Sequence, residues 1–132
     1  MGKIDCVFCD IGGTLGNYDP VANKLVVFPS TVPLLEVMRS LGLRLGVITT
    51  LGALTNTQGR ELLDAAGLLT YFDAAAFISE HDVNGATKPA AVIYQYAAQR
   101  VNVPIDRCLF IGENLVEVIG ATAAGMQSIL KP

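Results

Sequence analysis

Short apolar runs alternate with helical patterns along this 132-residue chain, and this order constrains the fold more than any other feature. Three of the runs show little alternation between apolar and polar residues, which is typical of strands covered on both faces. Strands that alternate with helices predict an α/β fold with a five-stranded parallel sheet and right-handed crossovers. The expected strands are Ile4–Cys9, Leu43–Thr49, Ala74–Ile78, Cys108–Gly112 and Gln127–Leu130.

Four segments between these runs carry apolar residues at helical spacing. Three of them end directly before a glycine, which is a common residue just after the last helical turn. Residues 16–30 are the one long piece with neither pattern. Because they follow the first strand, they are expected as a loop or flap over the carboxyl edge of the sheet. The expected helices are Thr31–Leu41, Asn56–Ala66, Pro89–Val101 and Asn114–Ala124.

The composition limits the class of protein. The length predicts a single domain over residues 1–132, and 52% apolar against 16% charged residues predicts a sizeable core. A net charge of −3 with no basic cluster argues against nucleic acid as a partner. No apolar stretch approaches the ~20 residues that span a membrane, and acids interrupt the N-terminal segment where a signal peptide would be apolar. The chain is therefore interpreted as cytoplasmic.

The three cysteines do not form a recognisable metal or disulfide site. Cys6 and Cys9 have C-x-x-C spacing, but both fall within the first expected strand. Side chains three apart in a strand point to opposite faces, so these two thiols cannot easily share a metal ion. We expect Cys6, Cys9 and Cys108 to be buried in strands.

Polar residues follow the expected strands at their carboxyl ends. Asp10 ends the first strand, Thr49 and Thr50 end the second, Lys88 precedes the third crossover helix, and Glu113 follows the fourth strand. In open parallel sheets, ligands bind beyond these ends of the strands. Each residue has an ordinary structural explanation alone, but their joint placement at one edge predicts a functional site.

Two of the charged residues have competing explanations. If Pro89 is the first helical residue, Lys88 lies at the positive end of a helix dipole, which is unfavourable by about 0.3–1 kcal/mol without an anion nearby. A phosphate, or the carboxylates of Asp10 and Glu113, would supply that anion. Glu117 lies three residues after Asn114, a spacing that fits a capping box at the start of the last helix.

Four ordered motifs resemble those of the haloacid dehalogenase (HAD) superfamily: "VFCDIGGTL", "LGVITT", "ATKPAAVIYQYA" and "LFIGENLVEVIGATAAGM". The resemblance covers residues 4–130 and implies a three-layer, Rossmann-like hydrolase fold. Only 21 residues separate Thr14 from Glu36, inside the first helix, and residues 50–88 are filled by one helix and one strand. The sequence therefore resembles a minimal member without a cap domain.

The resemblance implies a phosphatase mechanism. Asp10 would be the nucleophile that attacks phosphorus and forms an aspartyl-phosphate. Thr49 would hydrogen-bond a phosphoryl oxygen, and Lys88 would neutralise charge on the nucleophile and the phosphoryl group. Gly13 and Thr50 would complete the phosphate-binding set. The implied partner is a phosphorylated substrate whose identity the sequence does not give.

The resemblance also implies a Mg²⁺ site. Its ligands would be the Asp10 carboxylate, the Gly12 carbonyl and the acids of the fourth motif, Glu113 and Glu117. Mg²⁺ takes oxygen ligands in octahedral geometry, often one or two carboxylates together with phosphate. The family usually has aspartate at the position of Glu113, which is one methylene longer, so weaker metal binding is expected.

The first motif departs from the family pattern at Gly12, where a second aspartate is usual. In family phosphatases that aspartate protonates the leaving group and then activates water, and such groups contribute typically about 10²–10⁴-fold in rate. Two interpretations therefore stay open: a slow phosphohydrolase, or a catalytically impaired phosphate-binding or protein-interaction module. A site without a cap is open, which leaves room for a large substrate or for another subunit of a homo-oligomer.

Response-regulator receivers are an alternative of similar length and element order. They also combine a phosphorylated aspartate with a threonine and a lysine on a five-stranded parallel sheet. Their phosphorylated aspartate ends the third strand, whereas the third strand expected here ends before Ser79 and Glu80. The glycine turn after Asp10 and the late Gly112–Glu113 pair favour the HAD interpretation.

Overall fold

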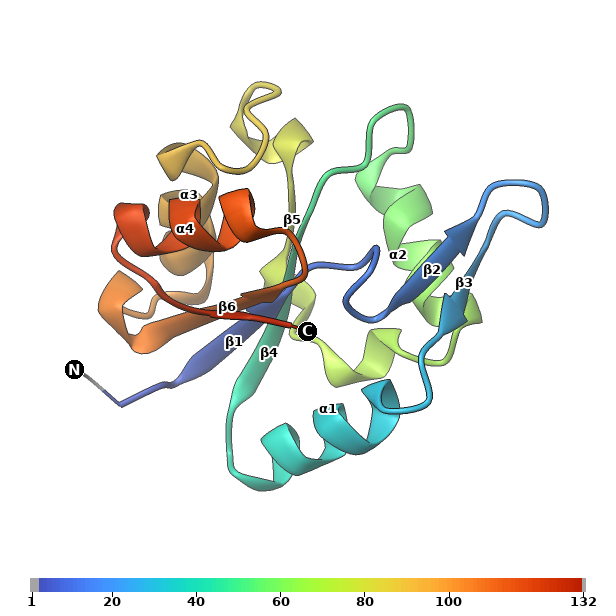
Figure 1. The fold of residues 1–132 in the computed structure, drawn as a ribbon, viewed down its shortest axis with the longest axis horizontal. Coiled ribbons are helices and arrows are strands. Elements are labelled where there is room, and N and C mark those ends of the chain that lie inside the picture. The colour runs from blue at the N-terminus through green and yellow to red at the C-terminus, as the bar shows by residue number, and fades with distance from the viewer. Residues whose placement is uncertain (1–2, 132) are drawn as a thin grey trace.

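The computed structural model describes residues 3–131 and contains one five-stranded sheet at its centre (Figure 1). The strand order is β5-β4-β1-β6-β7, and every neighbouring pair is parallel. The predicted parallel sheet is confirmed, and β1 lies in its middle. The strands are β1 (Cys6–Cys9), β4 (Arg44–Thr49), β5 (Phe77–Ser79), β6 (Cys108–Gly112) and β7 (Gln127–Leu130).

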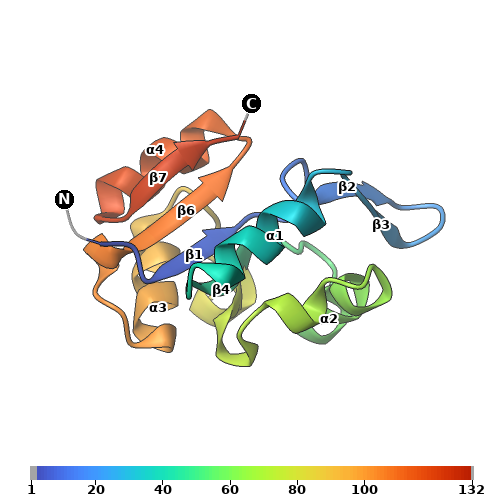
Figure 2. The ribbon, with the colours of Figure 1, turned by 90° about the horizontal axis from the view of Figure 1, so that it is seen from below.

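Helices cover the sheet on both sides, which makes the three predicted layers (Figures 1 and 2). One core cluster packs β1, β4, β5 and β6 against α3 and α4, and the other packs the opposite face against α1 and α2. Among the described residues, the structure holds no helix that could serve as a membrane span. The helices are α1 (Thr31–Ser40), α2 (Asn56–Ala65), α3 (Ala91–Val101) and α4 (Leu115–Ala124).

The apolar run of β1 explains why it occupies the middle of the sheet. Cys6 and Phe8 belong to the core on the α3–α4 face, whereas Val7 and Cys9 belong to the core on the α1–α2 face. Alternate side chains of a strand point to opposite faces, so a strand apolar at every position is stable only between two layers. The prediction that Cys6 and Cys9 face opposite ways is confirmed.

All three cysteines are buried and free, as predicted. Burial raises the pKa of the Cys6 and Cys9 thiols to about 12 and that of Cys108 to about 11. Thiols with such pKa values carry little thiolate at neutral pH, so these cysteines act as small apolar core residues.

The prediction that residues 16–30 form an irregular loop is wrong in part, because the segment contains an antiparallel hairpin. Oδ1 of Asp19 accepts hydrogen bonds from the N–H groups of Val21 (3.0 Å) and Ala22 (3.2 Å), and Asn23 adopts a φ of 50°. These interactions close the turn and pair the strands. The hairpin extends from the α1–α2 side of the molecule (Figure 1). Its strands are β2 (Gly16–Asp19) and β3 (Lys24–Val27).

Other boundaries also differ from the prediction, most of them by one residue, and the first strand begins at Cys6 instead of Ile4. The strand expected from Ala74 begins only at Phe77, because Asp73 caps a 3-10 turn over Ala74–Ala76 with its side chain. The helix expected from Pro89 begins at Ala91, with Ala90 in an extended conformation as its N-cap. Pro89 and Ala90 therefore separate Lys88 from the helix, whereas the sequence predicted that the helix directly follows Lys88.

Candidate active site

Asp10 lies at the carboxyl end of β1, between the strands β4 and β6 that flank it. Its side chain is 13% exposed, and its Oδ1 accepts a hydrogen bond from Ile11 N at 2.8 Å and forms an ion pair with Lys88 Nζ at 2.9 Å. Within residues 3–131, Oδ2 of Asp10 has no hydrogen-bond partner. One oxygen is thus held in place, and the other is available to a reacting group.

Lys88 is the centre of the charge network, although its side chain is only 1% exposed. Nζ lies 2.9 Å from Oδ1 of Asp10, 2.8 Å from Oε1 of Glu117 and 3.0 Å from the Ile48 carbonyl oxygen. It also stands 5.3 Å from the centre of the Phe110 ring. Two carboxylates and one carbonyl oxygen therefore surround the ammonium group and compensate its buried charge. The ion pair alone holds Oε1 of Glu117, which has no hydrogen-bond partner among the described residues.

The anion beside Lys88 was expected to be a phosphate or the paired carboxylates of Asp10 and Glu113, and the pair that the structure shows is Asp10 with Glu117. Glu117 supplies the second carboxylate, because it lies in the first turn of α4 and its Oε1 reaches Nζ. The capping box proposed for Asn114 and Glu117 is only half formed. Oδ1 of Asn114 accepts a hydrogen bond from Glu117 N at 3.1 Å, but the Glu117 carboxylate does not accept one from Asn114 N.

Tyr94 supports this network and was not identified from the sequence. The tyrosine is fully buried in α3, and its hydroxyl donates a hydrogen bond to the Glu117 carbonyl oxygen at 2.7 Å. Its ring meets Phe110 edge-on, with 5.6 Å between the ring centres. Burial, and then the negative charges of Glu117 and Asp10, raise the pKa of Tyr94, so it stays a neutral donor. A tyrosine within an apolar helical pattern gave no signal of this role.

The turn after Asp10 explains one of its two glycines. Gly13 has a φ of +76°, and a Cβ there would lie 2.5 Å from Cγ of Glu113, so only glycine fits. Its N–H donates to the Gly16 carbonyl oxygen at 2.9 Å, so a contact with phosphate would require that bond to open. Gly12 is different, because it is exposed and a Cβ there would meet nothing within 4 Å.

Threonines stand at the same edge of the sheet. Val47 in β4 is aligned with Cys9 in β1, so Thr49, two residues further on, lies level with the residue after Asp10. Thr49 is 4% exposed and Thr50 is exposed. Thr14 is also buried, and its Oγ1 has no hydrogen-bond partner among the described residues. The structure thus brings the Thr49–Thr50 segment to the edge that holds Asp10 and Lys88.

The donor set around Asp10 fits a small hard cation. Within residues 3–131, no three His, Cys, Asp or Glu side chains cluster closely enough to hold a metal by themselves. The Glu113 side chain lies against Gly13, the residue that follows Gly12 in the turn after Asp10. Two carboxylates and a carbonyl are oxygen ligands of the kind Mg²⁺ takes. Glu117 is held by Lys88 instead.

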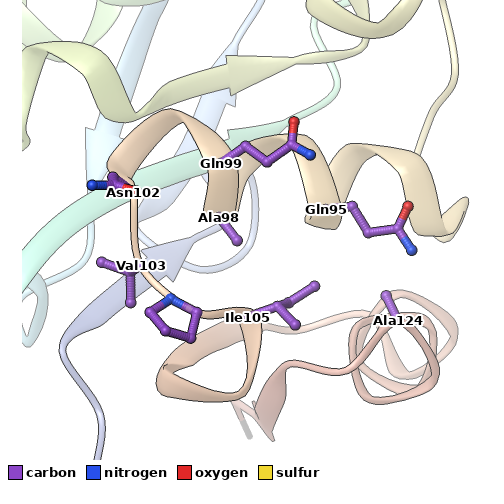
Figure 3. Close-up of a pocket in the computed structure, with 8 residues that line it drawn as sticks. Gln95, Ala98, Gln99, Asn102, Val103, Ile105 and Ala124 are labelled. Carbon is purple, nitrogen blue, oxygen red and sulfur yellow. The ribbon is translucent and has the colours of Figure 1, made fainter.

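A cavity of about 500 Å³ lies away from this site (Figure 3). It is formed by the last turns of α3 and by the loop that leads into the start of β6, so it lies toward the opposite edge of the sheet from Asp10. None of its lining side chains is charged, and it does not contribute to the charge network. The lining includes Gln95, Gln99, Asn102, Val103, Ile105 and Ala124.

Sequence comparison identifies relatives that act on phosphorylated compounds. A phosphatase of Mycobacterium tuberculosis is 34% identical over 103 residues, which cover 78% of this chain and 45% of the relative. A glyceraldehyde 3-phosphate phosphatase of Methanothermobacter thermautotrophicus is 34% identical over 104 residues, which cover 78% and 43% of the two chains. The chain spans less than half the length of these relatives.

Solved structures share the fold. A HAD phosphatase from Thermococcus onnurineus is 35% identical with a TM-score of 0.70, over 82% of this chain and 47% of that one. A protein from Listeria monocytogenes is 19% identical with a TM-score of 0.82, over 96% and 78%, which shows the fold alone. The haloacid dehalogenase-like hydrolase model matches residues 18–125, which include Thr49, Lys88 and Glu113. The chain belongs to the haloacid dehalogenase-like hydrolase family.

Proposed function

We propose that the chain is a Mg²⁺-dependent phosphohydrolase in which Asp10 is the nucleophile. The observation that carries this proposal is the 2.9 Å ion pair between Lys88 Nζ and Asp10 Oδ1, at a lysine side chain only 1% exposed. The pair orients the carboxylate, and Oδ2 remains available to attack phosphorus. The phosphatases among the relatives support the same class of reaction.

The proposed reaction has two steps. In the first, Oδ2 of Asp10 bonds to phosphorus while the bond to the leaving alcohol breaks, which gives an aspartyl-phosphate. The leaving oxygen takes its proton from solvent, because Gly12 has no carboxylate to donate one. In the second step, water attacks phosphorus, the bond to Oδ2 breaks and the proton of the water passes to solvent. The products are orthophosphate and the free Asp10 carboxylate.

Charge stabilisation is assigned to residues beside Asp10. The Lys88 ammonium group would offset the negative charge that approaches Asp10 with the phosphoryl group. The Thr49 hydroxyl and the Thr50 N–H would donate hydrogen bonds to phosphoryl oxygens, while Gly13 would shape the turn. A Mg²⁺ ion held by Asp10, the Gly12 carbonyl and Glu113 would supply further charge neutralisation at the phosphoryl oxygens.

Gly12 supports slow turnover and also a second candidate function. Without a positioned acid, both proton transfers depend on solvent, so poor leaving groups should react least. The same absence suits a module that binds phosphate, or another protein, with little or no hydrolysis. This second candidate predicts that no phosphoenzyme forms with any substrate.

A substrate panel distinguishes the two candidates. Aryl, acyl and alkyl phosphates would be incubated with wild type, Asp10→Asn and the exposed control Asp64→Asn, with Mg²⁺ or with EDTA. The phosphohydrolase proposal expects a rapid-quench phosphoenzyme that is acid-stable and hydroxylamine-sensitive, in wild type and Asp64→Asn only. EDTA should abolish it. Failure to trap a phosphoenzyme, even with acyl phosphates and Mg²⁺, would favour the binding module.

A further inference from the structure

The 3-10 turn η3 (Glu80–Val83) binds the loop that joins β4 to α2, residues 50–55. Three consecutive side chains, Glu80, His81 and Asp82, contact this loop or the first residue of α2. Thr49 at the end of β4 is paired with Ser79 at the end of β5. Because these strands are neighbours, the loop and the turn leave the carboxyl edge of the sheet together.

Glu80 binds the loop backbone with both of its carboxylate oxygens. Its Oε1 accepts a hydrogen bond from Leu51 N at 2.9 Å, and its Oε2 accepts one from Gly52 N at 2.9 Å. The glutamate is 6% exposed. Burial raises the pKa of Glu80, but the hydrogen bonds from Leu51 and Gly52 outweigh burial, and the pKa lies below its ordinary value. The carboxylate is therefore charged at neutral pH.

The next two side chains extend the contact along the loop. Nε2 of His81 lies 2.8 Å from the Leu54 carbonyl oxygen. The carboxylate of Asp82 accepts hydrogen bonds from Nδ2 of Asn56 at 3.1 and 3.2 Å, and from Ser79 N at 2.9 Å. The loop is thus fixed at residues 51, 52 and 54, and the first residue of α2 is fixed as well.

A buried negative charge is unfavourable at this place for an anion-binding protein. Glu80 follows Ser79, which is paired with Thr49, so the carboxylate lies near the segment assigned to the phosphoryl group. Like charges repel, and burial strengthens the repulsion. A neutral side chain would avoid this penalty. The carboxylate instead fixes the backbone of the two residues that follow Thr50, and its negative charge strengthens the hydrogen bonds that it accepts from them.

We propose that Glu80 is a positioning residue, which holds the Thr49–Gly52 backbone so that the Thr49 hydroxyl and the Thr50 N–H face the phosphoryl group. This role rests on the proposed function. Glu80 does not touch the substrate, and it acts through the two N–H groups that it binds. Its loss should therefore weaken phosphate binding more than it slows the chemical steps at Asp10.

The test compares Glu80→Gln with Glu80→Asp and with the exposed control Glu61→Gln. Glutamine offers one neutral acceptor oxygen in place of two charged ones, so it binds the two N–H groups more weakly. We expect faster amide hydrogen exchange at Leu51 and Gly52, and an increase of about tenfold in KM and in the orthophosphate Kd. The single-turnover rate at saturating substrate should stay near wild type. Glu80→Asp should recover part of the binding, and Glu61→Gln should match wild type.

Several results would overturn this role. An unchanged KM and orthophosphate Kd in Glu80→Gln would do so while leaving the proposed function intact, even if the variant melts at a lower temperature. A loss in the single-turnover rate at unchanged KM would also contradict it. If wild type neither binds orthophosphate nor hydrolyses any phosphoester, the proposed function fails and the positioning role fails with it. The wild-type arm therefore separates the two failures.

Discussion

Oε1 of Glu117 lies 2.8 Å from Nζ of Lys88, and this contact links α4 to the segment that precedes α3. Asp10 approaches the same ammonium group at 2.9 Å. One buried cation therefore stands between two carboxylates that enter from β1 and α4. The arrangement orients Asp10 and leaves one negative charge uncompensated, which suits the approach of a divalent cation.

Replacement of Lys88 tests how far this network stabilises the fold. Lys88→Met leaves two largely buried carboxylates without a counter-charge, so we expect a loss of about 3 kcal/mol in the free energy of unfolding at pH 7. Urea denaturation followed by circular dichroism would measure it. Lys24→Met, on the exposed hairpin, is the matched control and should change stability by less than about 0.5 kcal/mol. Equal effects of the two substitutions would contradict the network.

Introduction of an acid at Gly12 tests whether the missing carboxylate limits turnover. A Cβ at this position meets nothing within 4 Å, so a side chain can be attached there without a collision at Cβ. Gly12→Asp should raise kcat with alkyl phosphates by about 10²-fold or more, the lower range for a positioned acid–base group. Gly12→Asn has the same shape without the acid and should show no such gain. A gain of equal size with asparagine would assign the effect to the turn instead.

The strands and helices could be predicted because burial on two faces leaves a plain trace in the sequence. The residues of β1 are apolar at every position. The helix α2 ends shortly before Gly67, and α4 ends directly before Gly125. The strand β2 was missed because Gly16–Asp19 is short, polar and mostly exposed, so its stability comes from the turn that begins at Asp19. The Asp-Pro pair and the nearby Asn23 were the available signal.

The position of the candidate site could be predicted from the sequence, but the contacts between its side chains could not. The order of strands places Asp10, Thr49, Lys88 and Glu113 at one edge, which follows from parallel topology alone. The choice between two acids as the partner of Lys88 depends on the direction of side chains in the first turn of α4. Glu117 points from that turn toward the lysine, whereas Glu113 precedes the helix and lies against the glycine turn. No spacing rule distinguishes these outcomes.

Gly120 tests the close approach of α4 to the residue after Lys88. A Cβ at Gly120 would lie 2.9 Å from the Pro89 carbonyl oxygen and would also collide with the proline ring. Exposed Gly→Ala changes within helices usually stabilise by about 0.5–1 kcal/mol. We expect the opposite sign here, a loss of about 1–3 kcal/mol from overpacking. Val116→Ala, on the exposed face of the same helix, is the control. Stabilisation of Gly120→Ala in urea would contradict the packing.

The ion pair between Arg44 and Asp73 predicts how stability depends on pH. The hydrogen bonds from Arg44, and then that from Ala75 N, hold the pKa of Asp73 below its ordinary value of 3.8. A lowered pKa in the folded state means that the stabilisation is fully present above the unfolded value and is lost as pH falls through the folded value. Asp73→Asn should therefore be less stable than wild type at pH 7, and the difference should shrink below about pH 4.

Screening by solvent limits the stability difference between wild type and Asp73→Asn. The two side chains are 43% and 30% exposed, so we expect about 1 kcal/mol at pH 7 and less in high salt. Thermal or urea unfolding at pH 7, 5 and 3 would measure the gap between wild type and Asp73→Asn. Asp64→Asn, at an exposed position in α2, should show a gap near zero at every pH. A gap for Asp73→Asn that stays constant from pH 7 to 3 would exclude the ion pair as its source.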